Sequence, residues 1–371
     1  MLINEIKLSY NDIGVKPAIK SRIEHRSQCN PYVWGVNITL PIFASPMSTV
    51  VNKQNFGLFE ANNIIPILPR NIDLNTRLEY LKKGKWVAVG LEEFDELFLK
   101  KEWEIDYTKT LQVRVLIDIA NGHMIKMHQM VKQAKDKYGD KIVIMVGNIA
   151  NPETYTELAK AGADYIRFSV GTGNFCTTSS NTSVHYPIIS LLLESYEIKR
   201  QLEQMGMKTP KIIADGGIRN FDDVIKALAC GADYVMIGSE FVKLVESAAP
   251  TFYYKDGSMV EIDPFEHQIE ANIEGTFEVD GEYTIDNLYK VGYGMASRRG
   301  QEDINGKKTK TSEGIEKVFN CTTNMRKWAE NMESFMRSAM SYLDCFSIIQ
   351  INPDNVDVVR LSNATKESIN K

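Results

Sequence analysis

The chain has little of what marks a secreted, metal-binding or membrane-spanning protein. Its 371 residues include only five cysteines, which are odd in number, widely spread and free of any CxxC pair. This usage fits neither a disulfide framework nor a zinc site and indicates free thiols in a reducing compartment. No run of about 18 apolar residues is present, so the sequence predicts no membrane-spanning helix.

An excess of positive charge is also missing. The chain has 43 Lys and Arg against 48 Asp and Glu, a formal net charge of -5. This balance argues against a surface that follows a nucleic-acid backbone, although a single bound phosphate needs no net positive charge. The N-terminal residues 1–14 contain no basic segment followed by an apolar run, so we expect a cytoplasmic protein.

What the sequence does contain is a repeat of short apolar runs with helical patterns between them. Continuous apolar runs are typical of strands covered on both faces, and alternating strands and helices favour a parallel sheet. No GxGxxG motif follows an early strand, which disfavours a dinucleotide-binding Rossmann unit. We therefore predict an α/β fold, a TIM (β/α)8 barrel. The eight predicted strands lie at 41–45, 64–68, 86–91, 113–119, 141–147, 163–170, 211–217 and 232–239, and helices are predicted at 123–139, 152–162 and 221–231.

Three later stretches extend this barrel within one predicted domain, residues 1–371. Residues 248–290 alternate apolar and polar positions around DG turns, which predicts a β-hairpin insertion after the eighth strand. Residues 296–312 are polar and charged, the composition of a mobile flap. Residues 324–343 carry periodic Phe, Met and Leu, which predicts a C-terminal helix.

The sixth predicted strand leads into VGTGNFCTTSSNTSVHYP, residues 170–187, which places Cys176 at the barrel mouth. TIM-barrel active sites are built from the loops after the strands. A thiol there can act as a nucleophile once it is deprotonated, and Thr177 and Thr178 beside it could relay a proton. A passive loop cysteine is the alternative.

The last two predicted strands end in ADGGI, residues 214–218, and IGS, residues 237–239. TIM barrels commonly build a phosphate site here from backbone N–H groups, and two such endings side by side favour one over simple turns. Asp118 and Asn148 end the fourth and fifth strands, where they could hold ribose hydroxyls or a carboxamide. His123 has no partner at ligand spacing and is not expected to bind a metal.

This set of residues resembles the inosine-monophosphate (IMP) dehydrogenase and guanosine-monophosphate (GMP) reductase family. The resemblance covers nearly the whole chain except the 248–290 insertion, and its motifs are short but keep their order and their places at strand ends. They are LSYNDIGVKP (8–17), HRSQCN (25–30), ASPMSTV (44–50), IDIANG (117–122), VGNI, GTGNFCTT, ADGGI, IGS, YGMAS (293–297), SEG (312–314) and MRSAMSYLD (336–344).

The resemblance implies a TIM-barrel enzyme in which Cys176 attacks C2 of a purine mononucleotide while hydride passes between C2 and a nicotinamide cofactor. It implies a catalytic set of Cys176, Thr178 and Glu313. It implies that Glu313 binds the N1 edge of the purine. The other substrate-binding residues that it implies are Ser45, Met47, Asn148, Asp215, Gly216, Gly217, Gly238, Ser239, Tyr293, Gly294 and Met295. Cofactor binding falls to Asp118, Ala120 and Asn121. The carbonyls of Gly171, Gly173 and Cys176 match a monovalent cation site, with K+ as the ion, and a homotetramer is implied.

The reductase branch of the family is favoured over the dehydrogenase branch. Dehydrogenases activate water with an Arg-Tyr pair on the flap, and this flap has no tyrosine. The implied reaction is therefore NADPH-dependent reductive deamination of GMP to IMP and ammonia. Departures from the family pattern occur at Ser48, Asn174, Ser179 and the stretch 67–72. They raise the hypothesis of a deoxy or base-modified guanine nucleotide as substrate.

Three other interpretations have distinct tests. One is an NAD-dependent IMP dehydrogenase in which Arg298 or Arg299 replaces the missing flap pair, and oxidation of IMP would identify it. Another is a nucleotide-binding regulator on a decayed barrel, which would have no need of Cys176. The third is a flavin enzyme that shares the phosphate-loop endings, which an absorbance spectrum without a flavin band would count against.

Overall fold

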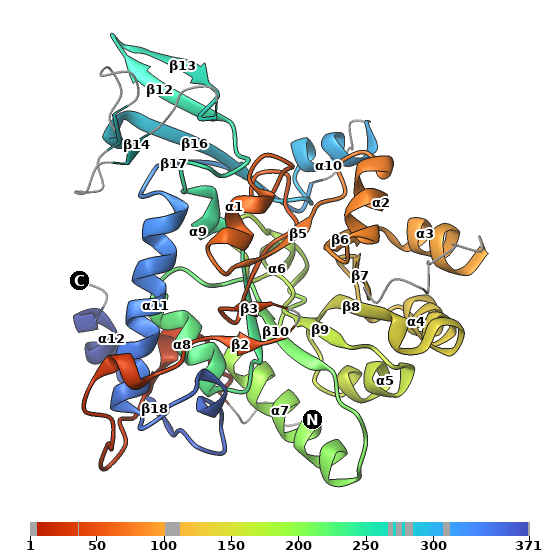
Figure 1. Cartoon of the computed structure of the whole chain (residues 1–371), viewed down its shortest axis with the longest axis vertical. Helices are drawn as coiled ribbons and strands as arrows, with labels where there is room; N and C mark the ends of the chain where they lie inside the picture. The colour runs from red at the N-terminus through yellow and green to blue at the C-terminus, as the bar shows by residue number, and fades with distance from the viewer. Residues whose placement is uncertain are drawn as a thin grey trace.

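The computed structural model describes residues 6–35, 37–100, 112–265, 270–271, 277–278, 285–306 and 312–369. Its centre is a closed barrel of eight parallel strands, one within or beside each predicted run, in the order β10-β11-β4-β5-β6-β7-β8-β9 (Figure 1). This confirms the predicted TIM barrel. The strands are β4 (Ile42–Ala44), β5 (Ile65–Leu68), β6 (Trp86–Val89), β7 (Val113–Asp118), β8 (Ile142–Ile149), β9 (Tyr165–Phe168), β10 (Lys211–Asp215) and β11 (Tyr234–Ile237).

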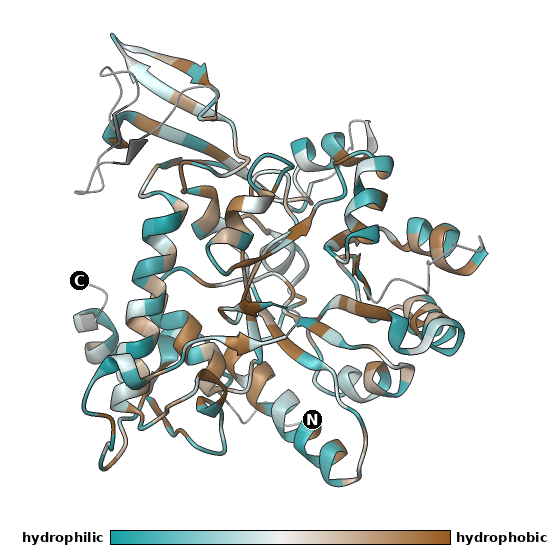
Figure 2. Cartoon of the chain, in the orientation of Figure 1, coloured by the Kyte–Doolittle hydropathy of each residue, from teal (hydrophilic) through white to brown (hydrophobic). Residues whose placement is uncertain are grey.

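Helices surround the strands and cover their outer faces. Brown, apolar strands lie at the centre of Figure 2, while the helices around them turn teal, polar residues outward. The surrounding helices are α1 (Phe56–Ala61), α2 (Leu74–Lys82), α3 (Leu91–Phe94), α4 (Ile125–Tyr138), α5 (Thr154–Ala161), α6 (Thr178–Thr182), α7 (Ile188–Gln204), α8 (Phe221–Ala229) and α9 (Ser239–Val242), and a π-helical turn, Asp95–Lys100, follows α3. The C-terminal helix is α11 (Met325–Tyr342), whose Trp328 ring packs on Phe221 of α8 with centroids 5.4 Å apart.

The barrel interior is filled in layers, because alternate residues of each strand point inward. The middle layer is a buried apolar cluster that contains Phe43, Leu116, Met145 and Met236. Two residues further along the strands, toward their C-terminal ends, the interior becomes polar. The three interior positions of β7 are thus Arg114, Leu116 and Asp118, and Asp118 faces the C-terminal mouth.

A second, antiparallel sheet stands out from the barrel in Figure 1, in the order β13-β12-β16-β17. Its strands are β12 (Thr251–Lys255), β13 (Ser258–Ile262), β16 (Leu288–Tyr293) and β17 (Glu316–Asn320), with a short pair β14 (Glu270–Ala271) and β15 (Phe277–Glu278) nearby in the sequence. Asp256 and Gly257 at the β12–β13 turn both have positive φ, at 50° and 83°, as a tight hairpin turn requires. The buried Lys290 ties this sheet to the barrel, because its Nζ donates to the carbonyl oxygen of Val245 (2.7 Å) and to Thr251 Oγ1 (2.6 Å).

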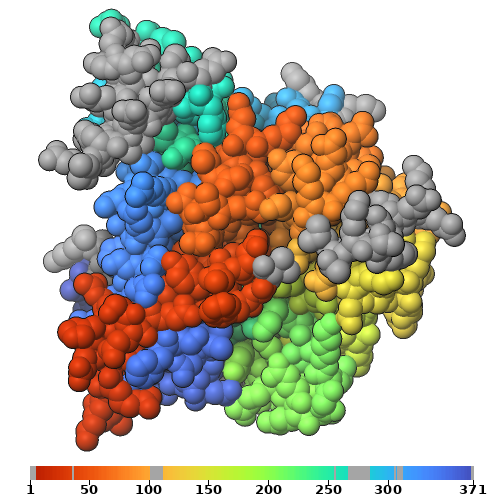
Figure 3. Space-filling view, viewed as in Figure 1, coloured from red at the N-terminus to blue at the C-terminus, as the bar shows by residue number. Residues whose placement is uncertain are grey.

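The two ends of the chain meet beside α8. Strand β1 (Ile13–Val15) pairs with β18 (Val358–Arg360), and red N-terminal and blue C-terminal residues lie side by side in Figure 3. The hairpin of β2 (Val33–Trp34) and β3 (Ile38–Thr39) lies across the N-terminal end of the barrel. The remaining elements are α10 (Arg298–Asn305), α12 (Asn363–Ile369) and the 3-10 turns Tyr10–Asp12, Arg26–Gln28, Gly139–Lys141, Ile285–Asn287 and Ile348–Gln350. A search of the described residues finds no helix with the length and apolar character to cross a membrane.

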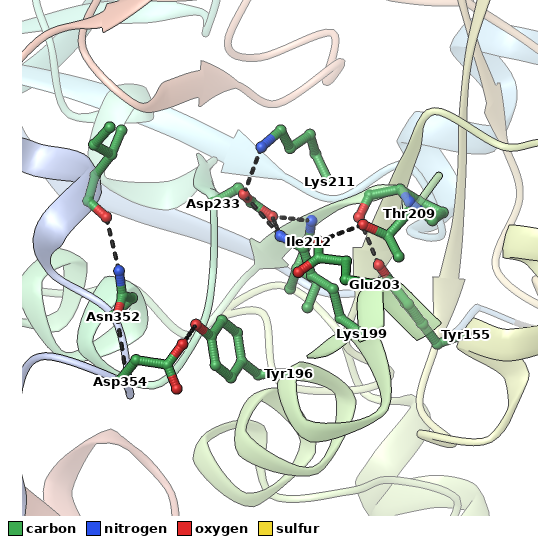
Figure 4. A network of polar contacts seen from close by, with 12 residues as sticks. Tyr155, Tyr196, Lys199, Glu203, Thr209, Lys211, Ile212, Asp233, Asn352 and Asp354 are labelled. Carbon is green, nitrogen blue, oxygen red and sulfur yellow. Dashed lines mark hydrogen bonds and ion pairs between the residues drawn. The ribbon is translucent and has the colours of Figure 1, made fainter. Parts of the chain in front are cut away.

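A buried polar network fixes the N-terminal ends of β10 and β11 (Figure 4). Asp233 accepts hydrogen bonds from Lys199 Nζ (2.8 Å) and from the backbone N–H of Ile212 (2.8 Å), and Lys211 Nζ lies 3.0 Å from it. Tyr155 donates to the carbonyl of Pro210 at 2.7 Å. These contacts lock helix α7 to two strands whose opposite ends carry the candidate site, which gives that site a rigid base.

Candidate active site

Cys176 lies in a tight loop that follows β9 and is clamped by a distant segment. Its N–H donates to the carbonyl of Gly173 at 3.0 Å, which closes a turn. Residues on either side pair with the segment after the flap: Thr177 N–H donates to the carbonyl of Glu313 at 2.9 Å, and Cys176 and Gly314 form an antiparallel bridge. The clamp brings the Glu313 carboxylate to the cysteine, although 137 positions (313 minus 176) separate them in the sequence.

The three predicted catalytic residues form a continuous hydrogen-bonded chain. The Cys176 thiol donates to Thr178 Oγ1 at 3.3 Å, and the Thr178 hydroxyl donates to Glu313 Oε2 at 2.6 Å. A hydroxyl can accept one proton while it donates another. The arrangement can therefore carry a proton from the thiol to the carboxylate and return it to a group bound beside the sulfur.

Cys176 is also the one cysteine of the chain that is partly exposed. It is half-buried, whereas the other four are buried. Burial raises the pKa of Cys230 to about 12 and that of Cys345 to about 11, so both remain protonated at neutral pH. Cys321 is likewise held protonated, because burial raises its pKa to about 11. Reactive thiols need partial exposure and access to the thiolate, and only Cys176 has that exposure.

A cavity of about 170 Å³ opens beside the Cys176 sulfur and gathers most of the predicted substrate residues. This volume is smaller than the ~300–1,000 Å³ of typical ligand pockets, so it holds part of a ligand such as a ring or a phosphate. The predicted residues that line it are Ser45, Met47, Cys176, Asp215, Gly216, Gly217, Gly238, Ser239, Gly294 and Met295, together with Gly173.

Backbone conformation explains the glycines at the floor of this cavity. Gly216 and Gly217 have φ of 92° and 79°, which side chains rarely adopt, and a Cβ at Gly217 would lie 3.1 Å from the Tyr10 ring. Gly238 is in close contact with Met47, since a Cβ there would lie 2.9 Å from its sulfur. Asn174, one of the departures from the family pattern, donates from Nδ2 to Ser239 Oγ at 2.9 Å and so lies in the same cluster.

Arg167, which the sequence analysis missed, joins two of the predicted residues. It is almost fully buried in β9, and its guanidinium binds Asp118 Oδ1 (2.7 Å) and Asp215 Oδ2 (2.8 Å). Burial alone would lower its pKa, but the two carboxylates outweigh this and hold the pKa above its ordinary value. Asn148 Nδ2 donates to the same Asp215 oxygen at 2.7 Å. Inward alternation along β9 was the signal that could have placed Arg167 among these groups.

The predicted cofactor residues lie outside the Cys176 cavity, at the end of β7 (Asp118) and on the loop that follows it (Ala120 and Asn121). Ala120 and Asn121 are exposed at the barrel rim, and Asn121 Oδ1 accepts from the backbone N–H of His123 at 3.1 Å. Asp118 faces inward through its bond to the buried arginine. The departure at 67–72 places Arg70 nearby, with its Nη1 3.4 Å from the Asp118 carbonyl.

Two of the three carbonyls predicted to bind a monovalent cation, those of Gly171 and Gly173, already accept hydrogen bonds. The Ser179 hydroxyl donates to the Gly171 carbonyl at 2.8 Å, and the Gly173 carbonyl accepts from Cys176 N–H. Each carbonyl has a second lone pair that a cation could use. Within the described part of the chain, no three His, Cys, Asp or Glu side chains gather as a metal site.

The predicted flap contains a helix, whereas its polar composition had indicated a loop. Helix α10 begins after Ser297, whose hydroxyl accepts from Gly300 N–H at 3.0 Å, and ends before Gly306, which has a φ of 63°. These are the usual N-cap and C-cap signals, and the sequence carried both. Gly300 is required by packing, since a Cβ there would lie 2.4 Å from the Gly294 carbonyl oxygen. Residues 307–311 of the flap lie outside the described residues.

Helix α10 is docked beside the cavity through Asp303. The Asp303 carboxylate accepts from the Tyr293 hydroxyl at 2.9 Å and from Ser48 Oγ at 3.0 Å. Burial and the bond to Asp303 raise the pKa of Tyr293 to about 12, so its hydroxyl remains a donor. The Arg299 guanidinium lies over the Tyr293 ring, 4.9 Å from its centroid. Ser48 is one of the departures from the family pattern, and the flap places a carboxylate against its hydroxyl.

Comparisons with known proteins agree on one family. A family profile described as the IMP dehydrogenase / GMP reductase domain matches residues 100–262 of the chain, a range that includes the Cys176 loop and strands β7 to β11. Proteins named GMP reductase from Staphylococcus aureus strains JH9, Mu50 and Newman are each 31% identical to the chain over 284 residues. These residues cover 72% of this chain and 82% of each relative.

Proposed function

This chain belongs to the IMP dehydrogenase / GMP reductase family, and on that premise we propose that it reduces GMP to IMP and ammonia with NADPH. The family acts on purine mononucleotides and uses a nicotinamide cofactor. The observation that carries the reductase assignment is the hydrogen-bonded chain Cys176–Thr178–Glu313 beside the cavity. Loss of an amine from C2 needs a nucleophile and a proton, and this chain of residues supplies both.

The first half of the proposed reaction exchanges nitrogen for sulfur at C2. The Cys176 sulfur bonds to C2 of GMP, and its proton passes through Thr178 to Glu313. The relay then returns that proton to the C2 amine, which leaves as ammonia, so the carbon–nitrogen bond breaks and a thioimidate joins C2 to Cys176. No proton is gained or lost overall in this half. The close contacts of 3.3 Å and 2.6 Å make the transfer short.

The second half returns the enzyme to its starting state. A bound nicotinamide cofactor would supply hydride to C2. The carbon–sulfur bond would then break, IMP would leave, and Cys176 would remain as a thiolate that takes a proton from solvent. Asp118, Ala120 and Asn121 would hold that cofactor at the rim after β7. The choice of NADPH over NADH belongs to this proposal.

The substrate would lie with its phosphate at the glycine-lined floor of the cavity. The backbone N–H groups after β10 and β11, with the Ser239 hydroxyl, would bind the phosphate, as they commonly do in TIM barrels. Asp215, held by Arg167 and Asn148, would orient the ribose, and Ser45, Met47, Tyr293, Gly294 and Met295 would line the nucleotide pocket. A K+ ion at the carbonyls of Gly171, Gly173 and Cys176 would stiffen the cysteine loop. A homotetramer is proposed from the resemblance.

A dehydrogenase is the second candidate, because one contact favours it. Dehydrogenases of this family activate water with an arginine and a tyrosine, and Arg299 of the flap lies over the Tyr293 ring. Here, however, the tyrosine hydroxyl donates to Asp303 and its pKa is raised to about 12, so it stays protonated at neutral pH and cannot take a proton from water. Oxidation of IMP with NAD would identify this alternative.

The deciding experiment follows NADPH absorbance with purified protein and GMP. We expect absorbance to fall at a rate that depends on both protein and GMP, with IMP and ammonia formed in equal amounts. The same assay with deoxy-GMP tests the modified-substrate hypothesis, and strict preference for GMP would remove it. If NADPH absorbance did not change with any guanine nucleotide, and IMP and NAD formed NADH, the chain would instead belong to the dehydrogenase branch.

Exchanging the side chains at positions 48 and 303 tests whether the contact between Ser48 and Asp303 holds the flap beside the cavity. Ser48→Asp places a second carboxylate about 3 Å from Asp303, and like charges at such a distance repel. We expect this variant and Asp303→Ser each to lower kcat/KM for GMP about 10-fold, which is ~1.4 kcal/mol. The double variant restores one carboxylate and one hydroxyl and should recover most of the loss.

The measurements are steady-state kinetics and limited proteolysis within the flap. We expect the flap to be cleaved faster in both single variants than in wild type, and at nearly the wild-type rate in the double variant. Additive losses in the double variant would show that Ser48 and Asp303 act separately and would contradict this account.

A further inference from the structure

A cavity of about 420 Å³ lies at the N-terminal end of the barrel, the end opposite to Cys176. One wall is the β2–β3 hairpin, including Asn37 and Thr39, and the other is formed by the first residues of the barrel strands, including Trp86 and Tyr165. None of the residues predicted to bind substrate, cofactor or cation lines it. It is therefore separate from the proposed active site.

The unusual feature of this cavity is Arg114. It occupies the first interior position of β7, two residues before Leu116, where TIM barrels usually place bulky aliphatic side chains. Among the described residues its one hydrogen-bond partner is the carbonyl of Gly84, which accepts from Nη1 at 2.5 Å, and no described carboxylate forms an ion pair with it. Arg114 is partly buried. Removing a cation from water without a counter-charge is costly, so such a group normally has an anionic partner.

The rest of the lining adds positive charge and aromatic surface. Lys85 pairs with Glu60 at 2.6 Å, whereas Arg114 and the exposed Lys83 form no ion pair with any carboxylate that the structure describes, in a chain whose net charge is -5. The Trp86 and Tyr165 rings meet edge to face, with centroids 5.3 Å apart, and form an apolar floor. Burial lowers the pKa of Arg114, and no carboxylate among the described residues pairs with the guanidinium to oppose that shift.

We infer that this cavity binds the oxyanion group of a small molecule, a phosphate or a carboxylate. A guanidinium has five N–H donors in a planar arrangement that matches these groups. In Arg114 only Nη1 donates to a described partner, the Gly84 carbonyl, so the other donors are available to a ligand. Lys83 at the mouth supplies a second cation, and the ring floor accepts the apolar part of the ligand. Because the site lies at the far end of the barrel, it can be filled while a nucleotide occupies the cavity at Cys176.

The test uses the full chain, saturated with GMP so that the proposed active site is occupied. Inorganic phosphate and benzoate are the two probes, each titrated at constant ionic strength against chloride. Tryptophan fluorescence reports on Trp86 in the cavity wall, and the melting temperature reports on binding to the folded state. The variants are Arg114→Met and Arg114→Gln, and Arg360→Met is the control, because Arg360 is an exposed cation on β18, outside the cavity lining.

We expect the wild-type protein and Arg360→Met to show saturable fluorescence changes and higher melting temperatures with at least one probe. Affinity should fall about 10- to 100-fold in both Arg114 variants, the loss of a charge-assisted hydrogen bond. In chloride alone, Arg114→Met should melt no lower than wild type, because an apolar side chain replaces a partly buried charge that has no ion-pair partner among the described residues. Response to phosphate alone would assign a phosphate ligand, and response to benzoate alone a carboxylate ligand.

Two results would overturn the inference. One is a wild-type protein that responds to neither probe beyond its response to chloride. The other is a change of association state in Arg114→Met without any effect of the probes, which would assign the cavity to a partner chain. Neither result bears on GMP reduction, so this inference and the proposed function can fail independently.

Discussion

Replacing Cys176 by alanine should abolish GMP reduction, with a loss of more than about 10⁴-fold in kcat. The reaction as proposed passes through a bond between the Cys176 sulfur and C2, and no other group can replace that sulfur. The four remaining cysteines are buried, and none lines the cavity. The fold should survive, because the thiol is only half-buried and a smaller side chain leaves the turn at Gly173 intact.

Two measurements separate this chemical loss from a loss of binding. GMP should still bind to Cys176→Ala and raise its melting temperature. Wild-type protein incubated with GMP in the absence of NADPH should carry a covalent adduct on the peptide that contains residue 176. Cys29→Ala is the matched control, since it removes a buried thiol far from the cavity, and it should keep its activity. Full activity in Cys176→Ala would refute the covalent mechanism.

The barrel could be predicted from the sequence because its signals are local. A strand covered on both faces is a continuous apolar run, and each of the eight runs contains or overlaps one strand of the barrel. Convergence of the strand-end residues then follows from topology alone, since parallel strands in a closed barrel end at the same mouth. This is why Ser45, Asp215 and Ser239, which are far apart in the chain, line one cavity.

The remaining features depend on contacts between distant residues. The bond between Thr178 and Glu313 spans 135 positions, and only the family resemblance pointed to it. Arg167 lies in an apolar strand, and its partners, Asp118 and Asp215, belong to two other strands. The sequence alone does not pair it with them, because the pairing depends on closure of the barrel. Helix α10 was read as a loop because its composition is polar, although its caps were visible at Ser297 and Gly306. No local pattern in the sequence indicates that Arg114 lacks an ion-pair partner among the described residues.

Interrupting the proton relay should have the second largest effect on activity. Thr178→Val removes the hydroxyl that bridges the thiol and Glu313, and Glu313→Gln removes the proton acceptor. We expect each to lower kcat by about 10²- to 10⁴-fold, the usual contribution of general acid–base catalysis. Thr178→Val should leave the KM for GMP nearly unchanged, whereas Glu313→Gln should also raise it, because Glu313 is proposed to bind the purine N1 edge.

The two positions form one relay, so their effects should not add. A double variant should be about as slow as the slower single variant, because breaking the same path twice costs little more. Thr178→Ser, which keeps a hydroxyl within reach of both neighbours, is the matched control and should retain most of the wild-type kcat. If Thr178→Val were as active as wild type, the hydrogen bonds of 3.3 Å and 2.6 Å would be structural and the proton would have to reach the leaving amine by another route. A multiplicative loss in the double variant would instead assign Thr178 and Glu313 to separate steps, with the carboxylate acting on the purine directly.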